Sequence, residues 1–242
     1  MGDTTSAIGR VRQIQRLLNG LPTREVVLDG LSRATAQIAL PRPRSDVAVG
    51  LDEVLAARKS HYRFHVEPPG AEELSSLLRW ALGPQRTVRL PAGGKHQLRM
   101  APSAGGLPSL TVYVTAKPGG DIPGGVFRYE PDGHCLETLW SGDPTAALRS
   151  VLVQPDFAER APVMVFLVAR LDTTLVKYPI RHYRTLHVDS GIAVQNLYLV
   201  ATALELAACA VTAFDDHIVT QLLRIPDSMF PTVVFPLGRR PD

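Results

Sequence analysis

The sequence predicts an α+β fold, with one compact domain preceded by an N-terminal extension. Three observations support this prediction. Apolar residues recur at helical spacing over 7–18, short strand-like runs separated by turn residues lie between 109 and 139, and a long apolar segment covers 187–206. No internal repeat or low-complexity tract is visible. A chain of 242 residues can bury a sizeable core, and we assign 1–50 to the extension and 51–242 to the domain.

Helices dominate the expected structure before residue 83. The apolar side chains of 7–18 fall on one helical face, and Gly20 is expected to end that helix. Residues 40–50, LPRPRSDVAVG, are proline-rich and are expected to run along the surface. A later helix has two glutamates in its first turn and a Gly-Pro pair after its last, which suit its two ends. We therefore expect helices at 7–18, 51–58 and 70–82.

The middle of the chain predicts a β-hairpin and the strand before it. Residues 126–130 and 134–139 have strand character and flank Pro-Asp-Gly, which is a favourable hairpin turn. Residues 109–116, SLTVYVTA, form the preceding strand. The remaining elements are expected in the order helix 143–152, strand 163–170, helix 187–206, helix 215–223 and strand 232–238.

The composition is that of a globular protein with a mild positive charge. Hydrophobic residues make up 45% of the chain, charged residues 20%, and the formal net charge is +3. This charge suits an anionic ligand, but there is no basic tract and no aromatic-studded RNA motif, so we expect no nucleic-acid partner. Cys135 and Cys209 lie far apart without CxxC spacing and are expected to be reduced, buried thiols.

The sequence favours a cytoplasmic protein without a membrane partner. The first residues contain no apolar signal core, so we expect no export. The one membrane candidate, 191–214, contains Gln195, Asn196 and Glu205 and has no cationic flank close to its C-terminal end. We interpret it as a buried core helix followed by a strand.

Several common chemistries lack their motifs. There is no G-x-S-x-G nucleophile turn, and neither cysteine has a recognisable nucleophile setting. His61 and His65 have i,i+4 spacing but lack the H-E-x-x-H carboxylate, so we expect no metal site. The glycine pairs match neither a Walker loop nor a G-x-G-x-x-G dinucleotide turn.

Three segments could bind parts of a ligand. RKSHYRF at 58–64 offers guanidinium and hydroxyl donors that suit a phosphate. The small residues in APSAGGLPSLTVYV at 101–114 would let the backbone approach a flat ligand. FPLGRR at 235–240 ends a strand with two arginines that can hold an anion. Taken singly, the first segment could equally be a solvated helix end, the second a loop before a strand and the third a basic tail.

A fourth segment, KYPIRHYR at 177–184, is dense in cations and tyrosine. It contains one lysine, two arginines, one histidine and two tyrosines, and it lies between two apolar stretches. Alone, it could be a surface loop stabilised by ion pairs and cation–π contacts.

These segments, in this order, resemble the nitroreductase-like flavoproteins, and most of all the azoline-oxidising branch called SagB-type dehydrogenases. The resemblance covers roughly residues 50–240. Each motif is weak alone, and their order makes the combination specific. The matching motifs are an R-x-S-x-R-x-F-like element that reads RKSHYRF at 58–64, P-S-A-G-G at 102–106, Lys177-Tyr178 before Arg181–Arg184, D-[AS]-G-x-x-x-Q-N-L-x-L at 189–199, Phe214-Asp215-Asp216 and P-x-G-R at 236–239.

The resemblance implies a nitroreductase-like fold, with a central, mostly antiparallel sheet flanked by helices and the long buried helix at a homodimer interface. It also implies a flavin mononucleotide (FMN) site at that interface. Phosphate contacts would come from the first and last motifs, ring contacts from the P-S-A-G-G loop, and Asn196 would lie near the same site. The implied cofactor-binding residues are Arg58, Lys59, Ser60 and Arg239 for the phosphate end, Pro102, Ser103, Ala104, Gly105 and Gly106 for the isoalloxazine ring, and Asn196.

In the azoline oxidases the Lys-Tyr pair handles a proton while the flavin takes a hydride from a thiazoline or oxazoline ring, which implies catalytic roles for Lys177 and Tyr178. A lysine acts as a base where burial or nearby cations disfavour its charged form, and Arg181 and Arg184 are close in sequence. Adjacent residues of an extended chain point to opposite sides, so both can serve only if the chain turns, and Pro179 favours a turn.

The implied substrate is a peptide-borne or carrier-bound azoline. No leader-binding or adenylating domain is visible, so a cyclodehydratase or carrier-protein enzyme is expected as the partner that supplies it. Two departures from the family pattern matter: Pro179 replaces the usual glycine, and 205–208 read Glu-Leu-Ala-Ala where the family has G-L-G-A. Two alternatives stay open, a nicotinamide-dependent reductase of nitro, quinone or dehydroamino-acid substrates and a flavin-free scaffold subunit.

Overall fold

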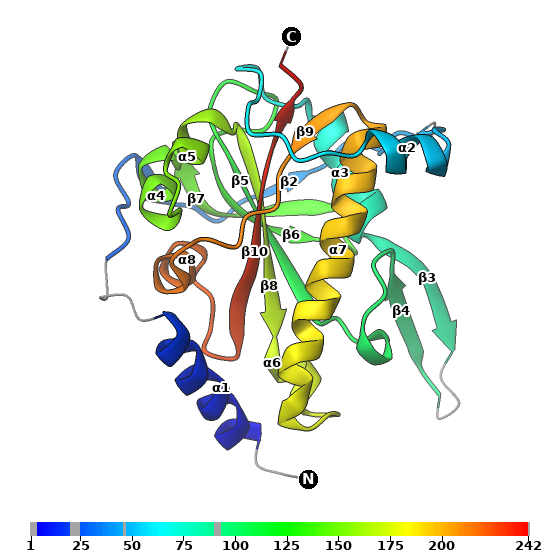
Figure 1. Ribbon diagram of the computed structural model, residues 1–242, viewed down its shortest axis with the longest axis vertical. Coiled ribbons are helices and arrows are strands. Elements are labelled where there is room, and N and C mark those ends of the chain that lie inside the picture. The colour runs from blue at the N-terminus through cyan, green and yellow to red at the C-terminus, as the bar shows by residue number, and fades with distance from the viewer. Residues whose placement is uncertain (1–3, 20–24, 46, 90–92, 242) are drawn as a thin grey trace.

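The computed structural model describes residues 4–19, 25–45, 47–89 and 93–241 (Figure 1). Its centre is an antiparallel sheet of eight strands in the order β1-β7-β6-β5-β8-β10-β9, with β2 also paired to β7. Helices cover both faces of this sheet (Figure 1). The expected α+β architecture with an antiparallel sheet is therefore confirmed. The strands are β1 Leu31–Arg33, β2 Gln37–Ala39, β5 Leu110–Ala116, β6 Gly125–Glu130, β7 Cys135–Gly142, β8 Val163–Arg170, β9 Leu206–Ala208 and β10 Met229–Arg239.

Every expected helix is present, with small shifts at the ends. The long helix begins four residues earlier than expected, inside the KYPIRHYR segment, and it ends at Ala203. Gly20, which we expected to end the first helix, lies outside the described residues. The expected helices correspond to α1 Thr4–Asn19, α2 Leu51–Ala57, α3 Ala71–Leu82, α4 Thr145–Val151, α7 Tyr183–Ala203 and α8 Asp216–Leu223.

Several short elements were missed from the sequence. One is a two-stranded sheet of β3 Pro84–Arg89 and β4 Lys95–Arg99. Most of its residues are polar or basic, and it shows no long alternation of apolar and polar residues. Two strands of three residues each pair with β7 inside the segment that we assigned to the N-terminal extension. The other missed elements are α5 Asp156–Arg160, α6 Leu171–Leu175 and the 3-10 turns Ala104–Gly106 and Ile180–His182.

Strand β8 explains why both faces of the sheet are covered. Its side chains alternate between two buried layers, so the strand is apolar throughout rather than every second residue. Val163, Val165 and Leu167 face the layer that contains α3 and α7. Met164 and Phe166 face the layer that contains α4, α5 and α8. The central sheet is therefore held by burial of apolar surface on each side.

The two cysteines and the apolar segment 191–214 have the structures that the sequence predicts. Cys135 and Cys209 are buried and carry free thiols. None of the described helices combines the length and apolar character that crossing a bilayer requires. The 191–214 segment is instead the C-terminal part of α7 followed by β9, as expected.

A buried polar chain ties the β6–β7 turn to α3. The Ser75 hydroxyl donates to the Pro41 carbonyl at 2.5 Å, so it accepts from His134 Nε2 at 2.7 Å. His134 Nδ1 then accepts from the Tyr129 hydroxyl at 2.9 Å. This arrangement uses a neutral imidazole. Burial, and then the charge of Arg79, lowers the pKa of His134.

The lowered pKa of His134 makes folding stability depend on pH. Because the unfolded chain binds the proton near the ordinary pKa of about 6.5 and the folded chain binds it lower, stability is lost as the pH falls below about 6.5. We expect the thermal midpoint to drop between pH 7.5 and 5.5, by about 2 to 4 °C for each 1 kcal/mol lost. His134→Gln should reduce this drop, since the glutamine does not titrate, while His61 and His187, whose pKa values burial also lowers, keep part of it. Parallel midpoint curves for the two proteins would contradict the assignment.

Candidate functional site

The segment after α2 is hydrogen-bonded to β9 and to the C-terminal end of β10. The amide of His61 donates to the Ala208 carbonyl at 2.8 Å, and the amide of His65 donates to the Arg239 carbonyl at 3.0 Å. Gly238 permits this approach, because a Cβ there would lie 2.9 Å from the Cβ of Phe64. The first and last motifs of the sequence therefore meet, as a shared ligand would require.

Arg58 and Ser60 converge on Tyr198 of α7. The Arg58 guanidinium lies 5.3 Å from the centre of the Tyr198 ring. The Ser60 and Tyr198 hydroxyl oxygens are 2.9 Å apart, and Tyr198 also accepts the Ala210 amide at 2.7 Å. Within the described chain Arg58 has no carboxylate partner, so its charge is available to an anion.

Arg240, rather than Arg239, joins the basic residues of the segment after α2. Arg239 is paired with Glu67 at 2.9 Å and with Glu73 at 3.4 Å. Arg240 donates to the Thr202 carbonyl at 3.2 Å. Burial, and then the charges of Lys59 and Arg240, lowers the pKa of His61, which fits an electropositive surrounding. We call Arg58, Lys59, Ser60, His61 and Arg240 the cation cluster.

The P-S-A-G-G loop is fixed by hydrogen bonds on several sides. The Ser103 hydroxyl donates to the Leu107 carbonyl at 2.5 Å, which turns the loop back on itself. The Ala104 amide donates to the Asp189 carboxylate at 3.2 Å, and Asp189 is only 3% exposed. His96 Nε2 lies 2.7 Å from the Gly106 carbonyl. Pro102 and Gly105 stay exposed between these anchors.

Lys177 and Tyr178 touch this loop at Gly105. Gly105 has φ +62°, and a Cβ at that residue would contact the Tyr178 hydroxyl and would lie 3.0 Å from Lys177 Nζ. The chain turns here, because the amides of both residues donate to the Thr174 carbonyl, and so both side chains reach the same place. The expected turn is therefore confirmed. Tyr178 also stacks on His182, with ring centres 4.0 Å apart.

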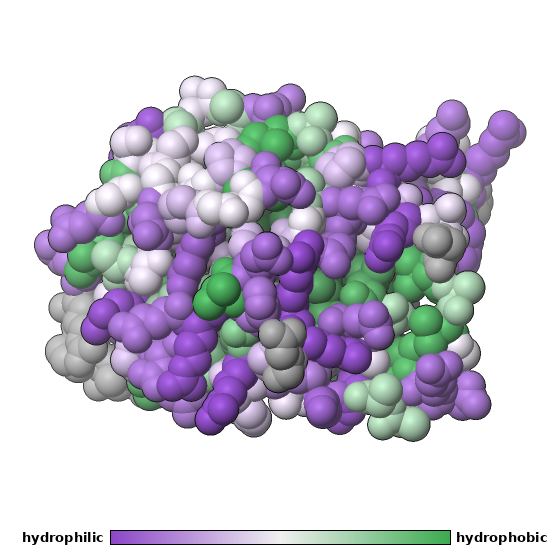
Figure 2. Space-filling view, turned by 90° about the horizontal axis from the view of Figure 1, so that it is seen from above, coloured by the Kyte–Doolittle hydropathy of each residue, from purple (hydrophilic) through white to green (hydrophobic). Residues whose placement is uncertain are grey.

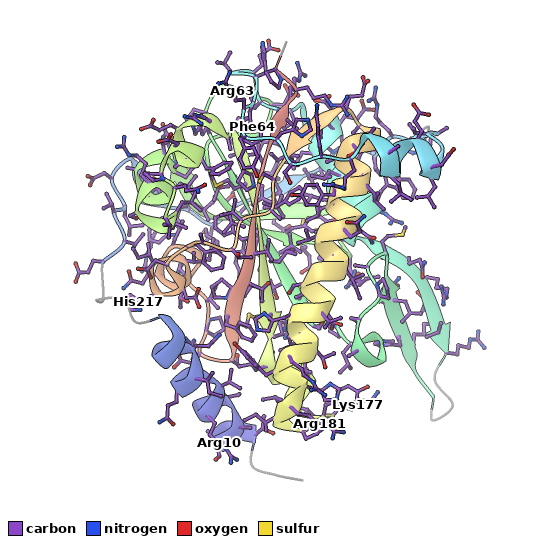
Figure 3. All side chains as sticks on the ribbon, in the orientation of Figure 1. Arg10, Arg63, Phe64, Lys177, Arg181 and His217 are labelled. Carbon is purple, nitrogen blue, oxygen red and sulfur yellow. The ribbon has the colours of Figure 1, made fainter. Side chains whose placement is uncertain are left out.

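We call Gly105, Lys177, Tyr178 and His182 the turn cluster. The Lys177 ammonium lies 5.3 Å from the centre of the Tyr178 ring. His182 Nδ1 is buried and has no hydrogen-bond partner among the described residues. Lys177 and Arg181 are exposed near the N-terminal end of α7 (Figure 3). This cluster therefore combines a solvated cation, a phenol and an unpaired imidazole nitrogen.

The two clusters lie at different heights along α7. The turn cluster precedes Tyr183, whereas Tyr198 lies fifteen residues further on, about 22 Å along the helix axis. The side-chain amide of Asn196 does not reach the polar groups of either cluster. It donates to the Ala81 carbonyl at 3.2 Å and so joins α7 to α3. In one chain the predicted phosphate residues and the predicted catalytic residues are therefore not brought together.

A cavity of about 310 Å³ lies behind the P-S-A-G-G loop. Pro102, Ser103 and Leu107 form one wall, and Asp189 lies on another. Arg99, Arg128 and Arg170 also line it, and each is paired with a carboxylate: with Asp132 at 2.7 Å, with Glu137, and with Asp172 at 3.0 Å, respectively. Within the described chain, these three arginines are therefore already engaged rather than free to bind an anion in the cavity.

Sequence reasoning did not single out four residues of these sites: His96, His182, Tyr198 and Asp189. Asp189 and His182 stood inside quoted motifs without a role of their own. Tyr198 looks like one more apolar residue of the long helix, and its hydroxyl gains partners only when 58–61 folds against it. No local pattern could have identified it.

Comparison with known proteins gives the class to which this chain belongs. The profile of the Nitroreductase family matches residues 55–239. A putative nitroreductase of Methanocaldococcus jannaschii is 28% identical over 206 residues, which cover 85% of this chain and 98% of that protein. The crystal structure of a putative nitroreductase from Ralstonia eutropha JMP134 has a TM-score of 0.70 and 27% identity, covering 92% of this chain and 100% of that one.

A chain of the Escherichia coli microcin synthetase McbBCD complex, determined with truncated pro-MccB17 bound, has the same fold. Its TM-score is 0.69 at 18% identity, and the match covers 100% of this chain and 95% of that chain. The chain belongs to the nitroreductase family. The protein is therefore a nitroreductase-family oxidoreductase, and the nitroreductase-like fold implied by the sequence is confirmed.

The left-handed turn at Gly105 gives a direct test of the turn cluster. Gly105→Ala should destabilise the protein by roughly 1–2 kcal/mol from φ alone, with a further loss from contact between the new methyl group and the Tyr178 hydroxyl. Urea unfolding measures this loss. Adding Tyr178→Phe should recover part of it, because the contacting oxygen is removed, whereas simple additivity would contradict the contact. Gly9→Ala, in the open part of α1, is the control and should not destabilise.

Proposed function

We propose that this protein is an FMN-dependent dehydrogenase that oxidises peptide-borne or carrier-bound thiazoline and oxazoline rings to thiazoles and oxazoles. The observation that carries the proposal is the contact of Lys177 and Tyr178 with Gly105. It joins two proton-transfer groups to a loop whose glycines leave the backbone open to a flat ligand. Likeness in fold to a chain of the microcin synthetase complex also supports it.

The residues of the two clusters fit FMN. The cation cluster supplies two arginines, a lysine and a hydroxyl over a short span, which suits a phosphate. Arg58 has no competing carboxylate in the described chain, unlike Arg239. We therefore assign the phosphate to Arg58, Lys59, Ser60 and Arg240, with Arg239 holding the adjacent segment in place. The backbone at Gly105 and Gly106 would face the isoalloxazine ring.

A second copy of the chain would bring the two clusters together. In one chain they are separated along α7, while apolar side chains beside that helix are exposed, among them Leu51 at 66%, Leu55 at 50% and Val188 at 59%. Figure 2 views the end of the molecule near α2 and has green, apolar surface on the side where α2 lies in Figure 1. Burying this surface against a second copy favours a homodimer, with each flavin held between the two chains.

The reaction divides between the cofactor and the chain. When bound, FMN supplies the electron sink that accepts a hydride from the ring carbon of the azoline. The chain's part is the proton: Lys177 as its free amine, or Tyr178 as its phenolate, would take it from the adjacent carbon, so that the ring gains a double bond. His182 stacks on Tyr178 and fixes the plane of the phenol. The substrate would come from a cyclodehydratase or carrier-protein enzyme.

Lys177→Ala should separate cofactor binding from catalysis. The variant should keep the flavin absorbance of the wild-type protein after desalting, because Lys177 is not in the cation cluster. Its rate of azole formation from a peptide thiazoline should fall by about 100-fold or more, the usual contribution of a general base. Tyr178→Phe tests the second group in the same assay. Full activity of Lys177→Ala would refute the assigned role, and a colourless wild-type protein even after adding FMN would favour the scaffold alternative.

Glu205 gives a test of the phosphate site. It has φ +58°, in the region that favours glycine, and its side chain lines the same cavity of about 260 Å³ as Arg240. Glu205→Gly should stabilise the chain by about 1 kcal/mol and should tighten FMN binding, because a negative charge near the phosphate is removed. Glu205→Gln removes the charge and keeps the backbone strain. If fluorescence titration gives unchanged FMN affinity in both variants, the phosphate does not bind beside Arg240.

The second candidate is a nicotinamide-dependent reductase. It is favoured by the two relatives of 27–28% identity, both named as putative nitroreductases. Anaerobic mixing with NADPH distinguishes the two, because a reductase bleaches its flavin rapidly without any peptide. Slow bleaching by NADPH together with rapid bleaching by a peptide thiazoline would support the dehydrogenase.

A further inference from the structure

The positive charge of this protein is concentrated in one segment. The whole chain contains 26 lysine and arginine residues and 23 aspartate and glutamate residues. Residues 74–120 contain six of the basic residues and none of the acidic ones. Without this segment the net charge would be negative. The segment includes the β3–β4 hairpin, which stands apart from the main sheet (Figure 1).

One face of the hairpin is basic and turned away from the protein. Side chains directly opposite each other share a face, and Arg89 is opposite Lys95 while Thr87 is opposite Gln97. Like charges opposite each other destabilise a strand pair unless an anion compensates them. Arg89 and Lys95 are exposed on this face, and Arg86, which is opposite Leu98 on the other face, is exposed as well. None of the three has a carboxylate partner within the described parts of the chain.

The other face connects the hairpin to the candidate site. His96 Nε2 lies 2.7 Å from the Gly106 carbonyl, and the Leu98 side chain lies 2.8 Å from the position of a Cβ at Gly106. Gly106 follows Gly105, which touches Lys177 and Tyr178. The hairpin itself is therefore anchored beside the turn cluster.

The hairpin also has free edges. Among the residues that the structure describes, β3 and β4 form a sheet of only two strands, so the outer edge of each has backbone groups without ladder partners there. An extended peptide can pair with such an edge, and its side chains then lie over the neighbouring strands. A single-stranded nucleic acid would instead need aromatic side chains on which to stack, and 83–100 contains no Phe, Tyr or Trp.

We propose that the β3–β4 hairpin is a docking strand for an acidic, extended segment of a peptide, whose carboxylates pair with Arg86, Arg89 and Lys95. The proposal rests on the proposed function only in identifying this peptide as the azoline-bearing substrate. Binding of the segment does not depend on the flavin chemistry. Two features select this occupant: a free strand edge, and unpaired cations on both faces of the hairpin, which the alternating side chains of an added strand would reach.

Fluorescence anisotropy with a labelled glutamate-rich peptide tests this proposal. The full-length dimer or monomer, as purified, should bind the peptide, and affinity should fall as salt is raised. Arg86→Glu/Arg89→Glu/Lys95→Glu should weaken binding by about tenfold or more. The control Arg10→Glu/Arg42→Glu/Arg224→Glu makes the same change in net charge at exposed residues elsewhere and should retain most of the affinity.

Each contrary outcome has a distinct meaning. Equal losses in the two triple variants, or no peptide binding, would overturn the docking site. Tighter binding of a labelled oligothymidylate that is lost in the hairpin variant would overturn the peptide assignment in favour of nucleic acid. Loss of binding at protein concentrations that promote dimers would assign the hairpin to an acidic segment of a second copy, and would also overturn it.

The same variants keep this proposal distinct from the proposed function. In the hairpin variant, flavin absorbance and oxidation of a small free thiazoline should be unchanged, while kcat/KM for an acidic thiazoline peptide should fall by about tenfold. Peptide binding that depends on the hairpin, without any azoline oxidation, would refute the function and keep the docking site. Oxidation that is indifferent to the hairpin variant would keep the function and refute the docking site.

Discussion

The packing of α7 against the sheet sets the geometry on which both clusters depend. One face of the helix, with Leu186, Ala193 and Leu197 fully buried, faces the central strands. On the same face Asp189 is buried as well and accepts the Ala104 amide, so the helix fixes the loop at the same time as it packs. A buried carboxylate is costly unless it is hydrogen-bonded, which ties the position of the loop to the position of the helix.

Glu205 adopts a backbone conformation that favours glycine. The resemblance to the azoline oxidases implies a glycine here, and in this chain a glutamate lies in the left-handed region at φ +58°. The surrounding structure imposes that conformation: Glu205 donates its amide to Thr202, and the next residues pair at once with β10. The departure therefore changes charge and strain near the cation cluster while the path of the chain is kept.

Much of the fold follows from local pattern, while the site follows only in part. Turn chemistry and strand-forming residues predict β6–β7, and helical spacing predicts α3, because these signals lie in the local sequence. The β3–β4 hairpin has no such face and is held by contacts such as His96 to Gly106. In the same way, the sequence offers Arg239 and Arg240 as neighbours, and only the carboxylates of Glu67 and Glu73, distant in sequence, decide which one is engaged.

The exposure of Lys177 bears on how the site is completed. A lysine in water is a poor base, because hydration stabilises its ammonium form. In one chain Lys177 is exposed, and the cations near it in sequence, Arg181 and Arg184, are exposed too. Under the proposed function, desolvation would come from groups that cover the turn cluster: a flavin, a second copy of the chain and a substrate. Proton transfer would be possible only in the assembled complex, so the free chain would be protected from unproductive chemistry.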